Sequence, residues 1–280
     1  MKFAYFPGCK ISFYMQDYGI SFKALMETLG VELIRLPFNC CGYPARKRSF
    51  EVSMLSSIKN LALAGKYDLD IITPCKCCFG QLKHASYWYE QNPALKEKID
   101  GFLAQENLSW DGKSHIKHLL SFLHADFGIR ALEKRIQKKL PGKKMAVQYG
   151  CHALRPFSIT GFDNPYAPKI FEELLSVTGV KPVEWSKSTE CCGNPIFNGN
   201  PELSLKILQN KMETARDAGA DYICTACTHC QMQYEMTQYQ KQLNNHSLPA
   251  ILFTQILGAA LGINNNLLSL SGKLPLALFP

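Results

Sequence analysis

The spacing of hydrophobic and polar positions changes along the chain between that of a β-strand and that of an α-helix. Each change marks the start of another predicted element. Short apolar runs predict strands at Lys2–Phe6, Val31–Leu36 and Asp70–Thr73. Between them, apolar residues recur at helical spacing over Ile20–Leu29 and Glu51–Tyr67. The second helix is expected to bury one face, which consists of Val52, Leu55, Ile58 and Leu61. The N-terminal half is therefore predicted to run β-α-β-α-β.

The same order of elements returns after residue 142. Strands are predicted at Met145–Tyr149, Val180–Trp185 and Asp221–Cys224, and a helix at Lys169–Thr178. A further helix is expected around Leu205, Leu208, Met212 and Ala215. Helices long enough to cross over join successive strands, so each sheet should be parallel. The expected fold is α/β, with two pseudo-symmetric Rossmann-like β-α-β-α-β halves, parallel sheets and helical appendages.

Two further stretches are expected to be helical. Residues 82–142 form a predicted appendage and linker, and residues 249–262 are its predicted counterpart in the second half. The apolar positions of the first stretch are Leu119, Leu120, Leu123, Leu132, Ile136 and Leu140. These stretches divide the chain into an N-terminal domain at 1–142, with a helical appendage, and a C-terminal domain at 143–280, with a C-terminal helix.

Ten of the twelve cysteines form one pattern that occurs twice. The two halves read C-x30-CC-x33-C-x2-C and C-x39-CC-x34-C-x2-C. The first set is Cys9, Cys40, Cys41, Cys75 and Cys78, and the second is Cys151, Cys191, Cys192, Cys227 and Cys230. Each group follows a predicted strand, and parallel strands end at one edge of a sheet. One thiol-rich site is therefore expected in each half.

Length and composition restrict the interpretation only slightly. A chain of 280 residues suits one large domain or two smaller ones, and a net charge of +8 favours an anionic partner only weakly. No nucleic-acid partner is expected. The N-terminal residues do not resemble a signal peptide, and no apolar run is long enough for a transmembrane segment. Cysteines in such a chain favour reduced thiols or metal ligands over disulfides. The expected location is the cytoplasm, or the periphery of the inner face of the membrane.

The residues alone leave the identity of the metal open. A structural zinc ion takes four ligands, whereas a fifth cysteine recurs in both halves, and adjacent cysteines point apart. An iron–sulfur cluster is larger and spans widely spaced thiolates, although a cubane cluster also needs only four. The pattern indicates two thiolate-rich cluster sites with a redox use, and it leaves the fifth cysteine unexplained.

The motifs resemble those of the cysteine-rich CCG domain family. They are FPGC at 6–9, NCCG at 39–42, TPCKCC at 73–78, YGCHALRP at 149–156, ECCGNP at 190–195 and TACTHCQMQ at 225–233. With FTQILGAALG at 253–262, nearly the whole chain resembles the B subunit of heterodisulfide reductases.

That resemblance implies a cofactor and a reaction. Each half would bind a noncubane [4Fe-4S] cluster through its five cysteines, one of which bridges irons. The two clusters would face a shared cavity and reduce a disulfide of low-molecular-weight thiols or of a protein, as in anaerobic metabolism. The family's fifth cysteine is the one that the zinc and cubane interpretations leave unused.

The resemblance also implies other subunits. The chain lacks the compact ferredoxin motif and any Gly-rich dinucleotide fingerprint, so electrons are expected from elsewhere. The implied partners resemble two other components of heterodisulfide reductases, a ferredoxin-like iron–sulfur protein (the C subunit) and a flavoprotein (the A subunit). An alternative is an electron-transfer subunit of a membrane-associated succinate, lactate or glycerol-3-phosphate-type oxidoreductase that passes electrons to quinone. The uncharged stretch from Gln242 to Gly272 would then lie on the membrane.

Lys10 and His152 directly follow the first cysteine of each half and are the candidate catalytic residues. Either could donate a hydrogen bond or a proton to a departing thiolate, and a supporting surface role is the alternative. Arg155 is a candidate partner for an anionic substrate group. Cys77 and Cys224 are interpreted as small buried residues rather than ligands. Glycines beside the ligands, at 8, 42, 150 and 193, should permit close backbone approach or positive φ. His84, His115, His118 and His124 are expected on helix surfaces.

Overall fold

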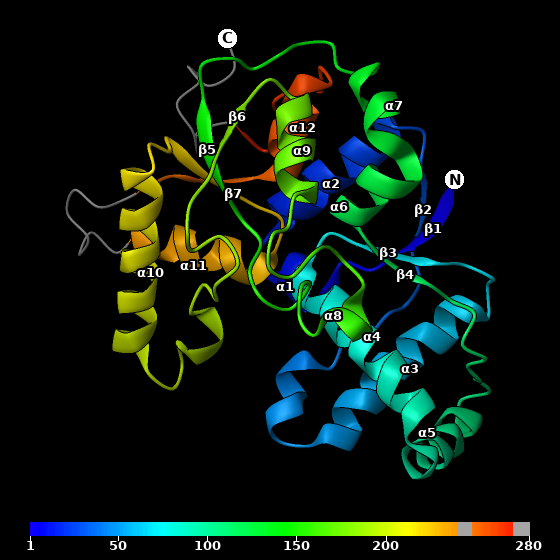
Figure 1. Cartoon of the computed structure of the whole chain (residues 1–280). Helices are drawn as coiled ribbons and strands as arrows, with labels where there is room; N and C mark the ends of the chain where they lie inside the picture. The colour runs from blue at the N-terminus through cyan, green and yellow to red at the C-terminus, as the bar shows by residue number, and fades with distance from the viewer. Residues whose placement is uncertain (240–247, 271–280) are drawn as a thin grey trace.

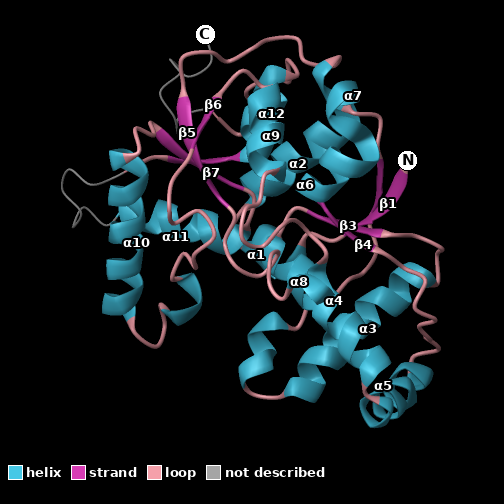
Figure 2. Cartoon of the chain, viewed as in Figure 1, coloured by secondary structure: helices cyan, strands magenta, loops and turns pink. Residues whose placement is uncertain are grey.

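Two parallel four-stranded sheets form the centre of the fold, one in each half (Figures 1 and 2). The computed structural model describes residues 1–239 and 248–270. The first sheet has the order β2-β1-β3-β4 and the second β6-β5-β7-β8, and every pairing is parallel. The strands are β1 Lys2–Tyr5, β2 Glu32–Ile34, β3 Ile71–Thr73, β4 Ile116–His118, β5 Lys144–Gln148, β6 Lys181–Val183, β7 Tyr222–Thr225 and β8 Ala250–Leu252. The predicted α/β class with parallel sheets in two similar halves is confirmed.

Helices connect the strands of each half. The first half contains α1 Gly8–Phe13, α2 Gln16–Thr28, η1 Tyr43–Lys47, α3 Phe50–Gly65, α4 Lys76–Gln91, α5 Pro93–Gln105, α6 Leu119–Ser121, η2 Phe122–Gly128 and α7 Ile129–Glu133. The second contains α8 Phe157–Thr160, α9 Ile170–Val177, η3 Asn194–Ile196, α10 Pro201–Asp217, α11 Thr228–Tyr239 and α12 Phe253–Ala260. Most predicted helices are present, with ends that differ by a few residues. Asparagine side chains that accept from Leu95 N and Leu203 N begin α5 and α10.

The structure corrects the prediction for the two stretches that were expected to be wholly helical. Residues 82–142 include β4, and residues 249–262 begin with β8, so each sheet gains a fourth strand. Both strands are three residues long, and Lys117 and His118 hide the alternation of β4. A strand this short produces almost no periodic signal, which is why the sequence analysis missed both.

The buried face of α3 also differs from the prediction. Ile58 and Leu61 are buried as expected, but Val52 is 56% exposed. Instead, Ser53, Ser57 and Asn60 turn inward, and their side chains bind the backbone of the Cys40–Gly42 segment. Polar residues occupy this face because the cysteine loop covers it, and that loop has carbonyls that need donors.

The two halves pack against each other through equivalent helices. Helix α12 of the second half contacts α2 of the first, while α6 and η2 of the first half contact α9 of the second. Figure 1 shows these helices grouped between the two sheets. Ser21 and Thr254 share a buried hydrogen bond of 2.8 Å across the α2–α12 contact. One buried hydrophobic cluster runs through both halves. The chain therefore folds as an internal pseudo-dimer with reciprocal contacts.

His118 lies at the centre of this pseudo-symmetry and not on a helix surface, which corrects the prediction. Its Nδ1 accepts from Leu120 N at 3.1 Å, so its Nε2 carries the proton. Nε2 lies 3.1 Å from the carbonyl of Pro74 and 3.2 Å from that of Ala226. These two residues are equivalent, because each precedes the CxxC cysteines of its half. Burial lowers the pKa of His118 to about 3, so the ring is neutral.

Three other histidines were expected on helix surfaces with His118. His124 does lie on η2, where Nε2 bonds Glu173 at 2.7 Å. His84 is on α4 but only 8% exposed, and His115 is exposed in the loop before β4.

Replacing His118 should weaken the joint between the halves. In His118→Phe, the Ala226 carbonyl loses its donor and the Pro74 carbonyl keeps only the Tyr18 hydroxyl. A buried carbonyl without a partner costs about 1–3 kcal/mol, so we expect the free energy of unfolding to fall by at least about 2 kcal/mol in urea. His115→Ala, at an exposed position, is the control and should change little. Equal stability of the two variants would contradict the bridging role.

Candidate metal centre

The first set of cysteines meets at the carboxyl end of the first sheet. Cys9 lies in the first turn of α1, Cys40 and Cys41 follow β2, and Cys75 and Cys78 lie where β3 passes into α4. Thiol contacts link them in the order Cys9–Cys40–Cys41–Cys78–Cys75, with 3.9 Å between the sulfurs of Cys9 and Cys40. The chain passes from β1 to β2 on one side of the sheet and from β3 to β4 on the other, and open α/β sheets bind ligands at such a switch point.

The second set repeats this arrangement. Cys151 follows β5, Cys191 and Cys192 follow β6, and Cys227 and Cys230 follow β7. Their contacts run Cys151–Cys191–Cys192–Cys230–Cys227, which is the same order by position. The structure thus brings together, within each half, all five cysteines that the sequence pattern grouped.

Glycines allow the backbone to approach these sulfurs closely. Gly8 has φ +67°, and a Cβ at this position would lie 2.6 Å from Cys78 Sγ. Gly150 has φ +73°, and its Cβ would lie 3.4 Å from Cys230 Sγ. Both glycines leave space at the thiols that a side chain would fill, as expected from the sequence.

The loop that carries each cysteine pair is fixed by the same polar contacts in both halves. Ser53 and Ser204 donate to the carbonyls of Gly42 and Gly193, each at 2.9 Å. Gln81 and Gln233, one on α4 and one on α11, donate in turn to these two serine hydroxyls. The cysteine pairs are thereby tied to the helices that carry the CxxC cysteines.

The two sets of thiols also touch each other. Cys75 and Cys227 are in thiol contact, and Thr228 Oγ1 lies 3.1 Å from Cys75 Sγ. Cys77 lies between the sets, 3.9 Å from Cys227 Sγ and 3.9 Å from His152 Nδ1. It is therefore buried, as predicted, but it is part of the thiol network. Cys224 is a buried residue on β7, and burial raises the pKa of its thiol.

A small gap of about 10 Å³, enough for about one water molecule, lies among the second set of thiols. Its walls include Lys76, Cys77, Cys151, His152, Cys191 and His229. Tyr43 closes the region from the first half, with its ring edge-on to His152 at 4.6 Å and to His229 at 5.8 Å. Sequence reasoning missed Tyr43 and His229, although both lie within two residues of a candidate ligand.

Thiol contacts shift the pKa values of individual cysteines strongly. The contact with Cys40 lowers the pKa of Cys41 to about 5, and the contact with Cys151 lowers that of Cys191 to about 2. The thiol of Cys227 holds the pKa of Cys75 well below its usual range. The contacts with Cys41 and Cys192 instead raise the pKa values of Cys78 and Cys230, so each set contains both thiols that ionise easily and thiols that hold their proton. Thiolates are the form that binds metals.

Two buried lysines lie beside the second set of thiols. Lys76 Nζ donates to the Gln148 carbonyl at 3.1 Å and faces the rings of Phe171 at 4.6 Å and Tyr149 at 5.2 Å. Lys211 Nζ donates to the carbonyls of Lys187 and Glu190. Burial lowers the pKa of Lys211 to about 8, and the Cys230 thiol opposes that shift.

The candidate catalytic residues occupy different environments. His152 Nδ1 lies 3.2 Å from Cys151 Sγ, and burial lowers the pKa of its ring, so it is neutral near pH 7. Lys10 is half-buried and lies over the Tyr14 ring at 5.1 Å. The contact with Cys40 and burial raise the pKa of Cys9, and the charge of Lys10 opposes this shift only in part. Arg155 donates to the Thr189 carbonyl at 3.2 Å and so is already engaged.

The donor sets fit a multi-iron group. Each half offers five thiols around a glycine-lined space, and the thiols form a linked chain rather than one compact tetrahedron. In the described part of the chain, no three His, Cys, Asp or Glu side chains are arranged to hold a single metal ion. Five thiolates spread over such a space suit a cluster better than an ion with four ligands.

Comparison with known proteins identifies the family. The model of the cysteine-rich domain called CCG matches residues 3–83 and 145–235, which contain both sets of cysteines. This chain belongs to the CCG family.

Curated relatives match the CCG chain over most of its length. It is 30% identical to a protein of Archaeoglobus profundus that is named as similar to the B subunit of heterodisulfide reductase, covering 94% of this chain and 92% of that one. It is 29% identical to the B subunit of a ferredoxin/F420H2-dependent CoB-CoM heterodisulfide reductase of Methanosarcina acetivorans, covering 94% and 90%. It is 31% identical to the 8-methylmenaquinol:fumarate reductase membrane anchor subunit of Wolinella succinogenes, covering 94% and 93%.

A solved structure has the same fold. A hypothetical protein from Helicobacter pylori superposes with a TM-score of 0.76 at 17% identity. The match covers 97% of this CCG chain and 51% of that one, so this chain spans about half of that protein. Among the residues described here, none of the helices has the length and hydrophobicity to span a bilayer.

The close packing around Gly42, which follows the first cysteine pair, predicts that its replacement destabilises the fold more than replacement of Gly30. Gly42 has φ +88°, and a Cβ there would lie 2.3 Å from the Ser53 carbonyl oxygen. Gly30 has φ +74° and nothing within 4 Å of its Cβ position. We expect Gly30→Ala to cost about 1 kcal/mol of unfolding free energy from backbone strain, and Gly42→Ala to cost at least about 2 kcal/mol more. Urea unfolding measures both, and equal losses would contradict the close packing of the cysteine loop on α3.

Proposed function

We propose that this chain is the catalytic iron–sulfur subunit of a heterodisulfide reductase-like complex. It reduces a disulfide to two thiols at two noncubane [4Fe-4S] clusters. The first cluster is assigned to Cys9, Cys40, Cys41, Cys75 and Cys78, and the second to Cys151, Cys191, Cys192, Cys227 and Cys230. Membership of the CCG family and the relatives named as heterodisulfide reductase components support an iron–sulfur electron-transfer role.

The observation that carries the proposal is the contact between the two thiol sets. Reducing one disulfide takes two electrons and two protons and yields two thiols. When bound, each iron–sulfur cluster supplies one electron at a time, so two neighbouring clusters match the two sulfur atoms of one bond. Cys75 and Cys227 touch, and Thr228 of the second half reaches Cys75 of the first. A substrate disulfide between the sets would therefore face both.

Residues around the contact are assigned to positioning and proton delivery. Tyr43, His152 and His229 enclose one side of the space and exclude water from it. His152, which is neutral, is proposed to donate a hydrogen bond from its ring to the departing sulfur. Lys10 is at the equivalent position in the first half and is half-buried, so it is proposed to connect that side with solvent protons.

Electrons must reach the clusters from other proteins of the complex. The proposed donors are a ferredoxin-like iron–sulfur protein, similar to the C subunit of heterodisulfide reductases, and a flavoprotein similar to their A subunit. The names of the relatives, which describe subunits of larger reductases, support assembly into a complex. The proposed location is the cytoplasm or the inner face of the membrane.

The function is tested by removing one cysteine from each set. After anaerobic purification, Cys41→Ser and Cys192→Ser should each lose about half of the iron, because each loses one of two equal clusters. Disulfide reduction with an artificial electron donor should fall at least about 10²-fold in both, because each cluster alone lacks its partner. Cys224→Ser, outside the network, should keep iron and activity. Full activity in a variant with half the iron would contradict the paired-cluster reaction.

A second candidate function is electron transfer to or from quinone. The relative of Wolinella succinogenes supports it, because its name describes a membrane anchor subunit of a menaquinol:fumarate reductase. Part of the uncharged stretch from Gln242 to Gly272, namely residues 242–247 and 271–272, falls outside the described residues. Reoxidation of the reduced protein by a soluble menaquinone analogue, compared with reoxidation by low-molecular-weight disulfides, separates the two functions.

A further inference from the structure

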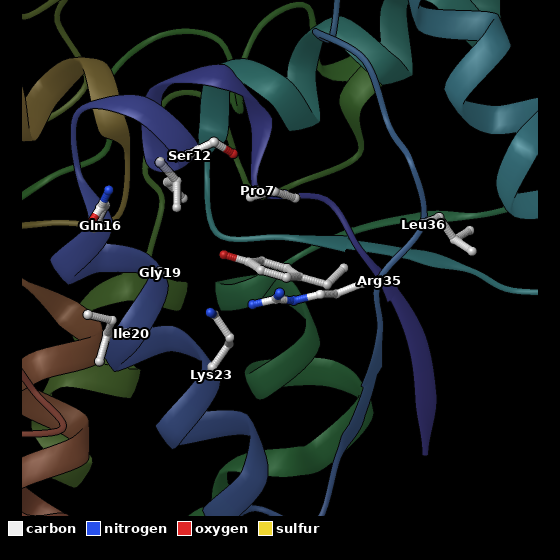
Figure 3. A pocket seen from close by; sticks show the side chains of 10 residues that line it. Pro7, Ser12, Gln16, Gly19, Ile20, Lys23, Arg35 and Leu36 are labelled. Carbon is white, nitrogen blue, oxygen red and sulfur yellow. The ribbon is translucent and has the colours of Figure 1, made fainter.

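A second pocket, which none of the cysteines lines, lies beside α1 and α2. It has a volume of about 420 Å³ and is lined by residues of α1, α2 and the segments after β1 and β2. Figure 3 shows Lys23 from α2 and Arg35 from the segment after β2 directed into the same space. This volume is in the range of small-molecule sites.

The pocket holds two positive charges without an acidic partner. In the described part of the chain, neither Lys23 nor Arg35 forms an ion pair or a side-chain hydrogen bond. Burial lowers the pKa of Lys23, and the nearby positive charge of Arg35 lowers it further. Arg35 is exposed and Lys23 is half-buried, so water screens their mutual repulsion, and an anion bound between them would be attracted to both.

Tyr5 adds a buried donor to the same pocket. It is 5% exposed, its hydroxyl has no hydrogen-bond partner, and it lines the cavity. Gly19 leaves the hydroxyl accessible, because a Cβ there would lie 3.5 Å from it. The equivalent position in the second half is Val147, which is fully buried. The fold thus needs only an apolar side chain at this position, and the hydroxyl is left for a ligand.

We propose that this pocket binds a tetrahedral oxyanion, such as the phosphate group of a small molecule. Lys23 and Arg35 supply the charge, and the Tyr5 hydroxyl donates one hydrogen bond. Pro7 and Ser12, also in the pocket wall, flank the cluster ligand Cys9, and Ser12 Oγ donates to the Gly8 carbonyl at 3.0 Å. An anion in the pocket therefore contacts the segment that carries Cys9.

Isothermal titration calorimetry with inorganic phosphate, in chloride buffer of constant ionic strength, tests the pocket on the full chain. We expect saturable binding at one site, at least tenfold weaker in Lys23→Met and Arg35→Met and weakened in Tyr5→Phe without loss of stability. Lys134→Met removes an exposed lysine elsewhere and should bind as the wild type does. Absence of saturable binding, or equal weakening by Lys134→Met, would overturn the proposal. Acetate binding as tightly as phosphate would point instead to a carboxylate, such as a partner's acidic side chain, and would also overturn it.

A separate observation concerns the charges around the two thiol sets. Lys76 and Lys211, which are 2% and 0% exposed, both lie at the second set. Aligning the halves on their cysteines places Thr228 opposite Lys76, and aligning them on Ser53 and Ser204 places Asn60 opposite Lys211. Asn60 donates to the Cys40 carbonyl at 3.1 Å, much as Lys211 donates to that of Glu190. Both side chains bind a carbonyl of the loop that carries the cysteine pair, but the positive charge is present only in the second half.

From this asymmetry we infer, on the basis of the proposed function, that the second-half cluster is reduced first. A buried positive charge stabilises the more negative, reduced form of a nearby centre and so raises its reduction potential. Lys10, which acts on Cys9 of the first set, is half-buried, and solvent screens it. The first electron would therefore be held at the second set, and the second electron would reach the first set afterwards.

A redox titration followed by electron paramagnetic resonance tests the order. The wild type should show two midpoint potentials, and Cys41→Ser, which keeps only the second cluster, should keep the higher one. Lys211→Asn and Lys76→Thr, which introduce the residue found at the equivalent position of the other half, should each lower the higher midpoint by at least tenfold in the reduction equilibrium, or about 59 mV. Lys211→Arg keeps the charge and should keep the midpoint, and Lys206→Met on the exposed side of the same helix is the control.

Iron content, measured on the same samples, separates the two possible failures. Iron-free wild-type protein would contradict the proposed function itself. Two outcomes would overturn only the order of reduction. One is wild-type protein whose two iron-loaded clusters share one midpoint potential. The other is that Lys211→Asn and Lys76→Thr both retain iron and leave the midpoint potentials unchanged. If a lysine variant loses iron, the wild type, Lys211→Arg and Cys41→Ser still test the order. They show whether the two clusters have different midpoint potentials and whether the higher one belongs to the second cluster.

Discussion

The arrangement of this protein depends on the junction where β3 and β7 end side by side. Each strand ends in a Thr-x-Cys segment, and one imidazole N–H, that of His118, satisfies the carbonyls just before both CxxC cysteines. The shared donor keeps the equivalent segments close together. As a consequence Cys75 and Cys227 touch, although 151 residues separate them in the sequence. Both the thiol network and the proposed reaction require this closeness.

The sequence predicts the sheets well where the signal is local. Strands β1, β3, β5 and β7 are apolar and precede cysteines, so their order and the edge at which the thiols gather follow from pattern and topology. Strands β4 and β8 could not be recognised, because three residues carry no usable period. The positions of His118 and Cys77 could not be recognised either, since their partners Ala226 and Cys227 belong to the other half.

Other features were accessible from the sequence but were not used. Aligning the halves on their cysteines pairs Lys76 with Thr228, and aligning them on the serines that bind Gly42 and Gly193 pairs Asn60 with Lys211. Comparing the halves position by position, and not only at the cysteines, would have revealed an uneven distribution of charge. The same comparison pairs Tyr5 with Val147, which marks the Tyr5 hydroxyl as unnecessary for the fold. In a duplicated protein, the differences between equivalent positions indicate where the halves have separate tasks.

The central claim is that two multi-iron centres lie close enough to act on one disulfide. Electron paramagnetic resonance of the fully reduced, anaerobically purified protein tests it most directly. The account predicts two paramagnetic centres whose signals are broadened or split by their mutual magnetic interaction, and a single unsplit signal when either cysteine pair is replaced by serine. Two centres without interaction, or a protein without any iron-based signal, would contradict it.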